Sequence, residues 1–232
     1  QQYLDHFVER RVDGLILIPA SNCEEMLSFY QELELPKVII DRPIEGLDVP
    51  IVMTDNVRGA YMATNHLLNR GRRRILFSSG RRDLGASVER RVGYLQALRE
   101  FGITDEWIRY GEFSFQSGRE IASTAYTNLS FDGLFCANDL IALGAIQSLI
   151  ARGVKIPQQV EVVGYDNIFF AEFSSPSLTT IEQPAYKMGT EAVKVILDGI
   201  RNSSSAEMSV KLLEPRLIIR SSSPEKDAKH DI

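Results

Sequence analysis

Polar side chains follow the short apolar runs of this sequence, at the positions where predicted strands would end. The residues that follow successive runs are Ser21 and Asn22, Asp41 and Arg42, Thr54, Asp55 and Asn56, Gly80 and Arg81, Asn138 and Asp139, and Asp166 and Asn167. In open α/β sheets, ligands bind beyond the carboxyl ends of the strands. A cleft edged by so many hydrogen-bonding groups suits a sugar, a nucleoside or a similar polar small molecule.

Each of these residues also has a purely structural interpretation. Asn and Asp after a strand commonly cap the next helix or form a turn. Asn138 precedes the apolar stretch LIALGAIQSLI and is a good N-cap candidate, and Asp55 could cap a helix over residues 57–70. The set therefore predicts a ligand site more strongly than any one of its members.

Arg90 and Phe113 are two further candidates. Ser87 resembles an N-cap, which would place Arg90 in the first turn of a helix, where a cation opposes the helix dipole at a cost of ~0.3–1 kcal/mol. Arg90 also lies off the apolar stripe of Val88 and Val92. It is either a solvated arginine or one that holds a ligand hydroxyl or carboxylate. Phe113 either packs in the core or forms an aromatic floor for a sugar ring or base.

Known catalytic and metal-binding patterns are missing from the sequence. His6, His66 and His230 have no metal-ligand spacing, and there is no nucleophile elbow, P-loop or glycine-rich dinucleotide turn. Cys23 and Cys136 make no disulfide framework and favour reduced thiols in a cytoplasmic protein. We therefore expect no enzyme activity, no cofactor and no metal.

Strands and helices alternate in the elements that must position the candidates. Strands are predicted at 14–19, 37–40, 50–53, 74–79, 108–111, 133–137 and 160–165, and helices at 1–12, 57–70, 87–101, 117–129, 139–151 and 184–198. Gly71, Gly102 and Gly199 are the predicted helix ends. The alternation indicates parallel sheets with helices on both faces, either one doubly wound sheet or two smaller ones.

The last part of the chain departs from this alternation. KLLEPRLIIRSS contains two strand-like pieces around Glu214 and Pro215, which fit a hairpin or a strand pair at a sheet edge. Residues 202–206 read as a loop and residues 223–232 as a flexible tail.

Composition is that of an ordinary globular protein. The 232 residues are 44% hydrophobic and 25% charged, and the net charge is -5. A segment that gripped a nucleic-acid backbone by itself would usually be basic, so we expect this one not to bind DNA alone. No apolar stretch reaches the ~20 residues that span a bilayer, so we expect no membrane partner.

Segments along nearly the whole chain resemble, in order, the landmarks of the LacI/GalR transcriptional regulators. They are VDGLILIP, VIIDRP, HLLNRGRRRILFSSG, SVERRVGYLQAL, FDGLFCANDLIALGAIQSLIARGVKIPQQVEVVGYDN, SLTTIEQPAYKMGTEAV and LLEPRLIIRSSS. The resemblance implies two Rossmann-like subdomains of the type I periplasmic-binding-protein kind, with parallel sheets flanked by helices. It also implies three crossovers around an effector cleft, a homodimer and a helix-turn-helix headpiece.

The resemblance also implies which residues contact the effector. The matching positions are Arg90 in SVERRVGY, Asp166 in GYDN, Asn138 in CANDLIALGA and Phe113 in GEFSFQSG. Asp55 is a weaker match near the subdomain boundary, and Gln183 lies at a crossover where it would touch the ligand or the hinge.

The expected N-terminal subdomain is residues 1–71 plus 184–201, and the C-terminal subdomain is residues 72–180 plus 207–222. The headpiece and the first strand and helix of the family core are absent from the sequence. We therefore expect the N-terminal subdomain to be truncated and part of the effector site to lie upstream.

The predicted function is allosteric control of operator binding. A small polar effector, most simply a carbohydrate, would close the inter-subdomain cleft and change the headpiece spacing in the dimer. The alternative is a periplasmic sugar-binding protein of an ABC transporter, against which the ending LLEPRLIIRSS argues. An enzyme on a doubly wound fold is a third class, without a catalytic constellation to support it.

Overall fold

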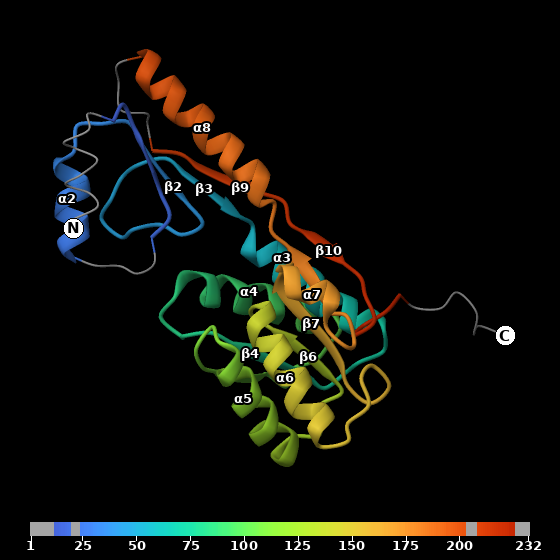
Figure 1. The fold of residues 1–232 in the computed structure, drawn as a ribbon. Coiled ribbons are helices and arrows are strands. Elements are labelled where there is room, and N and C mark those ends of the chain that lie inside the picture. The colour runs from blue at the N-terminus through green and yellow to red at the C-terminus, as the bar shows by residue number, and fades with distance from the viewer. Residues whose placement is uncertain (1–11, 20–23, 203–207, 226–232) are drawn as a thin grey trace. The chain divides into compact units, whose positions relative to one another are not determined.

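The computed structural model describes residues 12–19, 24–202 and 208–225, and its strands form two sheets (Figure 1). The four-stranded sheet has the order β1-β2-β3-β9, all parallel. Its strands are β1 (Leu15–Leu17), β2 (Lys37–Ile40), β3 (Ile51–Thr54) and β9 (Val210–Leu213). The predicted helix over 1–12 lies almost wholly outside the described residues, as do Cys23 and most of the predicted loop at 202–206.

The six-stranded sheet has the order β10-β8-β7-β6-β4-β5, and β10 alone runs antiparallel to its neighbour. Its strands are β4 (Ile75–Ser79), β5 (Trp107–Tyr110), β6 (Gly133–Cys136), β7 (Glu161–Asp166), β8 (Thr179–Glu182) and β10 (Arg216–Ile218). The strands predicted from their apolar runs are all present, and two smaller sheets share them. The predicted α/β class with parallel sheets is therefore confirmed.

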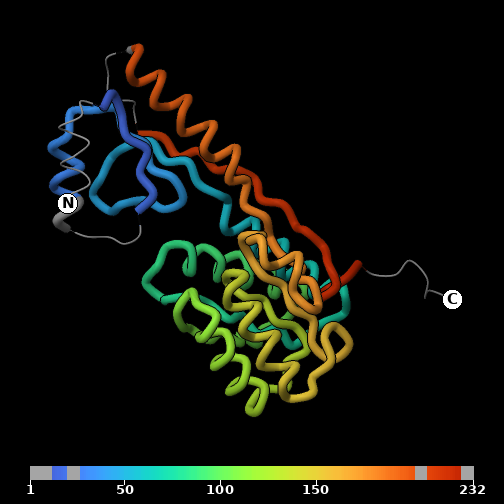
Figure 2. Tube along the Cα trace, in the orientation of Figure 1, coloured from blue at the N-terminus to red at the C-terminus, as the bar shows by residue number. Residues whose placement is uncertain are grey.

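Two compact units divide the chain, and the chain passes between them at 55–56, 183–184 and 213–214 (Figure 2). Unit 1 consists of Gln1–Asp55 and Pro184–Leu213, and unit 2 of Asn56–Gln183 and Glu214–Ile232. This division differs from the expected boundary after residue 71. The helix α3 (Asn56–Asn69) packs on α4 (Gly85–Glu100) and on strands of the six-stranded sheet, so it belongs to unit 2.

The two strand-like pieces around Glu214 and Pro215 form no hairpin. β9 pairs in parallel with β3 in unit 1, whereas β10 pairs with β8 in unit 2. β8 itself was not predicted from the sequence TTIE, because a run of two threonines and one isoleucine carries a weak apolar signal. Residues 208–213 consequently contribute to unit 1 and not to the C-terminal subdomain in which we expected them, and residue 207 lies outside the described residues.

Unit 1 has two described helices, α2 (Glu24–Glu32) and α8 (Ala185–Asn202). α8 runs through Gly199, where we predicted its end. Gly71 and Gly102, which do end helices, have left-handed φ angles of 91° and 68°, whereas Gly199 is not among the positive-φ glycines. None of the described helices is both long and apolar enough to cross a membrane.

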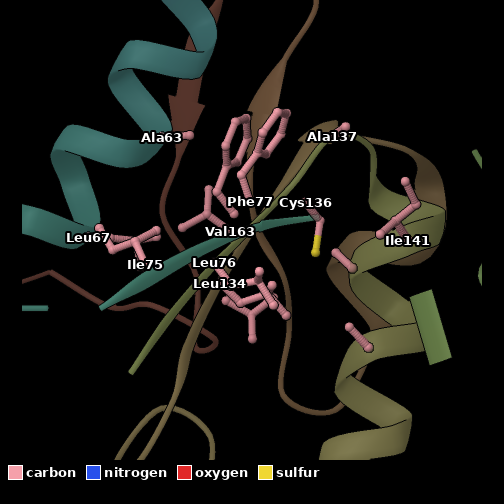
Figure 3. Packing of buried hydrophobic residues seen from close by; sticks show 14 of the residues in the cluster. Ala63, Leu67, Ile75, Leu76, Phe77, Leu134, Cys136, Ala137, Ile141 and Val163 are labelled. Atoms are coloured by element: carbon pink, nitrogen blue, oxygen red, sulfur yellow. The ribbon is translucent and has the colours of Figure 1, made fainter. Parts of the chain in front are cut away.

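Helices cover both faces of the six-stranded sheet in unit 2. They are α3, α4 (Gly85–Glu100), α5 (Phe115–Asn128), α6 (Asp139–Ala151) and the short α7 (Phe169–Phe173). Figure 3 shows Ala63 and Leu67 of α3 on one side of the strands and Ile141 of α6 on the other. In the core, the ring of Phe77 stacks on Phe135 with centroids 4.9 Å apart.

α5 and α6 pack at backbone contact through a reciprocal pair of glycines. A Cβ atom on Gly118 would lie 2.0 Å from the carbonyl oxygen of Ile141, and one on Gly144 would lie 2.0 Å from that of Phe115. Only glycine fits either position. This close packing fixes the start of α6 at the carboxyl edge of the sheet.

At the opposite, amino edge of the sheet, a buried glutamate holds several segments together. The carboxylate of Glu161 accepts hydrogen bonds from Arg70 Nη2 and Arg72 Nη2, each at 3.0 Å, and from Ser223 Oγ at 2.6 Å. Ser223 is itself buried and contacts His66. The predicted flexible tail therefore begins later than residue 223, because this contact anchors Ser223 in the fold.

Replacing Glu161 by alanine should lower the free energy of unfolding by about 3 kcal/mol, because it removes one partner of a buried ion pair. Urea denaturation measures this loss. Glu106→Ala is the control, since the exposed pair of Glu106 with Arg91 contributes at most about 1 kcal/mol. Equal stability of the two variants would contradict the structural role of Glu161.

Candidate functional site

The carboxyl edge of the six-stranded sheet brings together five of the six predicted site residues. Gln183 follows β8, Asp166 ends β7, Asn138 follows β6, and Phe113 follows β5. Arg90 reaches the same edge from α4. This edge is where ligands bind in open α/β sheets.

Arg90 is buried, with only 4% of its surface exposed. Its Nε donates to Asn56 Oδ1 at 2.9 Å, and its Nη1 donates to the carbonyl oxygen of Ala137. The guanidinium carbon lies 3.6 Å from the centroid of the Tyr165 ring, a close cation–π contact. Nη2 lies 3.8 Å from Oδ1 of Asp166. Arg90 is therefore not the solvated arginine that its position in the sequence also allowed.

Two glycines, one in α3 and one in α4, allow close packing of the elements around Arg90 and Tyr165. A Cβ atom on Gly93 would lie 2.1 Å from the carbonyl oxygen of Val57, so α3 and α4 approach at backbone contact. A Cβ atom on Gly59 would lie 2.4 Å from the hydroxyl of Tyr165, so the ring rests directly on α3. The guanidinium then fits over that ring.

Asn56 orients the guanidinium through a fixed amide group. Its Nδ2 donates to Glu89 Oε2 at 2.8 Å, which leaves Oδ1 directed at Arg90. The start of α4 also differs from expectation. α4 begins at Gly85 with Leu84 at the N-cap, so Ser87 is a buried first-turn residue and Arg90 lies in the second turn.

Asp166 presents its carboxylate from a strained turn. Its φ is 109° and that of Asn167 is 55°, both in the left-handed region that residues other than glycine seldom adopt. Gln183 Nε2 donates to Asp166 Oδ1 at 2.7 Å. Asn167 Nδ2 donates to Glu182 Oε1 at 2.8 Å. With 27% of its side chain exposed, the Asp166 carboxylate combines fixed partners with access to solvent.

The three remaining candidates, Asn138, Phe113 and Asp55, differ in what they contact. Asn138 caps α6 as predicted, since its Oδ1 accepts from the backbone nitrogen of Ile141 at 2.9 Å. Phe113 is half-buried against the core, and its ring crosses Gly80, where a Cβ atom would lie 2.1 Å from a ring carbon. Asp55 is the last residue of its segment in unit 1, where its backbone nitrogen donates to Leu213 at 2.9 Å.

Asp139 is an important residue of this edge that we did not select as a candidate. It is fully buried, and its carboxylate accepts from Thr180 Oγ1 at 2.6 Å and from the backbone nitrogen of Ile168 at 2.8 Å. Burial raises the pKa of the Asp139 carboxyl to about 7, and these two hydrogen bonds oppose the rise. The signal in the sequence was a second polar residue after β6, which resembles an ordinary first-turn carboxylate.

Asn56 and Tyr165 were also not selected. Asn56 appeared among the strand-end residues, but nothing in the sequence linked it to Arg90. Tyr165 reads as one more apolar position of a buried strand. Both residues support the arginine, so their roles depend on contacts that the fold alone creates.

The arrangement suits recognition. It offers guanidinium donors and carboxylate acceptors side by side, which can hold the hydroxyl groups of one polar ligand. Among the described residues there is no group of three or more His, Cys, Asp or Glu side chains that could hold a metal ion.

Comparison with known sequences gives consistent matches. The sequence model of a family described as a periplasmic binding protein-like domain matches residues 64–223. The HTH-type transcriptional repressor PurR of Vibrio atlanticus is 34% identical over 226 residues, which cover 95% of this chain and 67% of the repressor. The PurR repressor of Pasteurella multocida is 30% identical over 96% of this chain. The chain thus spans about two-thirds of the length of these curated relatives.

Solved structures give the same result. The transcriptional regulator CelR in complex with cellobiose superposes with a TM-score of 0.86 at 31% identity, covering 95% of this chain and 69% of that one. A LacI family transcriptional regulator from Enterococcus faecium with bound ribose gives a TM-score of 0.84 at 30% identity, covering 97% and 85%.

The raised pKa of Asp139 predicts a pH dependence of stability. The unfolded carboxyl ionises near its usual pKa of 3.8 and the folded one near 7, so the fold binds an extra proton between these values. The stability that the protonated Asp139 carboxyl contributes to the fold is fully present below about pH 4 and is lost as the pH rises towards 7. Relative to Asp139→Asn, the unmodified chain should lose on the order of 2 kcal/mol of unfolding free energy between pH 5 and 7.

Urea denaturation of both proteins at several pH values measures the difference. His66 and the other titrating groups are common to both proteins and cancel. A difference that stays constant from pH 5 to 7 would show that Asp139 is ionised throughout this range.

Proposed function

Because this chain belongs to the LacI/GalR family of transcriptional regulators and is a ligand-sensing core of that family, we propose that it binds a small polar effector through Arg90 and Asp166. The observation that carries the proposal is the buried guanidinium, which Asn56, Ala137 and Tyr165 hold in place beside a half-buried carboxylate. Burying a charge is costly unless it is paired. The buried charge of Arg90 at the carboxyl edge of the sheet, where ligands bind in such folds, therefore favours a role in ligand binding.

The effector we propose is a carbohydrate or a nucleoside-like molecule. Sugar hydroxyls both donate and accept, so one ligand can use the guanidinium of Arg90 and the carboxylate of Asp166 together. Gln183 bonds to Asp166 and would orient it, and Phe113 and Asn138 end neighbouring strands of the same edge. The related structures with bound cellobiose and ribose support this class of ligand. Asp55 stays a predicted contact.

Regulation of DNA binding is the proposed output. The curated relatives are named HTH-type transcriptional repressors, which supports operator binding through a helix-turn-helix domain outside this chain. Effector binding would then change operator affinity by a coupling free energy between the two sites. The same relatives support a cytoplasmic regulator without catalytic activity.

We also propose that the chain forms a homodimer through an apolar face of unit 2. A shallow groove of about 730 Å³ there is lined mainly by side chains of α5, α6 and α7. Phe170 and Phe173 of α7 are 65% and 66% exposed, and Leu140 and Ile150 of α6 also face solvent. Monomeric proteins seldom expose so many large apolar side chains together, so a second copy of the chain is the proposed occupant.

Arg90→Ala and Asp166→Ala should each weaken effector binding at least about tenfold, because each removes a charge-assisted hydrogen bond to the ligand. Calorimetric titration with sugars, nucleosides and amino acids identifies the ligand and measures the loss. Arg91→Ala is the matched control, since Arg91 is exposed on the same helix. Native affinity in both site variants, with the fold intact by circular dichroism, would refute the site.

Phe173→Ser should raise the dimer dissociation constant by at least about tenfold, because it removes a large apolar side chain from the proposed interface. Sedimentation velocity at micromolar concentration measures the change. Val88→Ser, at an exposed position of α4, is the control and should leave the dimer intact. A monomeric unmodified chain, or a Phe173→Ser variant that dimerises normally, would exclude this face.

A further inference from the structure

Asp139 is the first residue of α6, and its side chain faces the turn that presents Asp166. One carboxylate oxygen accepts from Thr180 Oγ1 of β8 at 2.6 Å, and the other accepts from the backbone nitrogen of Ile168 at 2.8 Å. Gly164 of β7 makes room for it, since a Cβ atom there would lie 2.2 Å from Asp139 Oδ1. The fold thus brings strand β7 unusually close to this carboxylate.

The segment that Asp139 holds is strained. Asp166 and Asn167 both have left-handed φ angles. Such conformations persist only where the surroundings over-determine them, and they gather at functional sites. Asn167 N donates to Thr180 Oγ1 at 3.4 Å, and Thr180 Oγ1 in turn donates to Asp139. Asp139 therefore holds the turn twice, directly at Ile168 and through Thr180 at Asn167.

The same hydrogen bonds fix the start of α7. Ile168 is the N-cap residue of this helix and has no side-chain cap, so the bond from its backbone nitrogen to Asp139 is its tie to α6. α7 carries Phe170 and Phe173, and α6 carries Leu140, all on the apolar face of unit 2. Asp139 therefore links two parts of unit 2. It contacts the turn that presents the Asp166 carboxylate, and it joins α6, of which it is the first residue, to the start of α7.

We propose that Asp139 is a positioning residue that sets the Asp166–Ile168 turn for effector binding and ties that turn to the start of α7. This inference rests on the proposed effector site. Asp139 itself does not touch the ligand. It acts by holding Asp166 where Arg90 and Gln183 also reach it.

Charge on Asp139 should matter for this role. Thr180 Oγ1 and Ile168 N are both donors, so ionisation of the carboxyl strengthens both hydrogen bonds. The titratable groups around it are Asp166 at the end of β7 and the buried thiol of Cys136 on β6, whose pKa burial raises. Since the Asp139 pKa is about 7, these two hydrogen bonds should be stronger above that pH than below it, although desolvation of the ionised carboxylate lowers the stability of the fold as a whole.

The first test uses the ligand-free chain. Asp139→Ala and Thr180→Val should speed hydrogen exchange of the Ile168 amide about tenfold or more, measured by NMR, because each removes part of its support. Thr64→Val is the matched control, since Thr64 is a buried threonine whose hydroxyl donates to the carbonyl oxygen of Ala60 within α3. Unchanged exchange at Ile168 in both variants would overturn the proposal.

The second test uses whichever of cellobiose, D-ribose and adenosine the unmodified chain binds with Arg90-dependent affinity. The affinity of the unmodified chain for that ligand should rise several-fold from pH 6 to 8. Asp139→Asn removes the charge and should abolish the rise. The control Thr64→Val should keep it. A purely structural aspartate would leave the pH profile unchanged in Asp139→Asn, and that result would also overturn the proposal. If none of the three ligands binds, that result counts against the proposed class of effector. The exchange rate of the Ile168 amide then tests by itself whether Asp139 holds the turn.

Discussion

The buried guanidinium of Arg90 is the interaction on which the rest of unit 2 depends. An arginine taken out of water needs several partners to offset its lost hydration. Here they come from three different elements: Asn56 at the start of α3, Ala137 after β6 and Tyr165 near the end of β7. The glycine contacts between α3 and α4, and between α3 and Tyr165, are the packing that lets these elements meet at one point.

The two edges of the six-stranded sheet use charge differently. At the amino edge, the Glu161 carboxylate accepts hydrogen bonds from two arginines and a serine, and the bond from Ser223 anchors the last described segment of the chain. At the carboxyl edge, Arg90 and Asp166 lie 3.8 Å apart and Asp166 is partly open to solvent. The first arrangement stabilises, and the second keeps hydrogen-bonding capacity for a partner. That contrast supports recognition at the carboxyl edge beyond what residue types alone indicate.

Much of the fold follows from local patterns in the sequence. Apolar runs and helical stripes predicted most helices and the strands except β8, and Gly71 and Gly102 end helices because their left-handed φ angles favour glycine. The pairing of β9 and β10 with different sheets was not predictable, because sheet partners are chosen by contacts distant in sequence. The same limit applied to the site. Arg90 could be either solvated or functional until Asn56, 34 residues away, was placed beside it.

Arg90, the arginine of the proposed effector site, is already held in place before any ligand binds. Hydrogen exchange of the Arg90 Nε–H group, followed by NMR in the ligand-free chain, tests this most directly. Burial and the bond to Asn56 predict exchange at least about tenfold slower than for the exposed Nε–H of Arg91. Exchange of the two groups at the same rate would mean that the guanidinium of Arg90 is open to water, and would contradict the account.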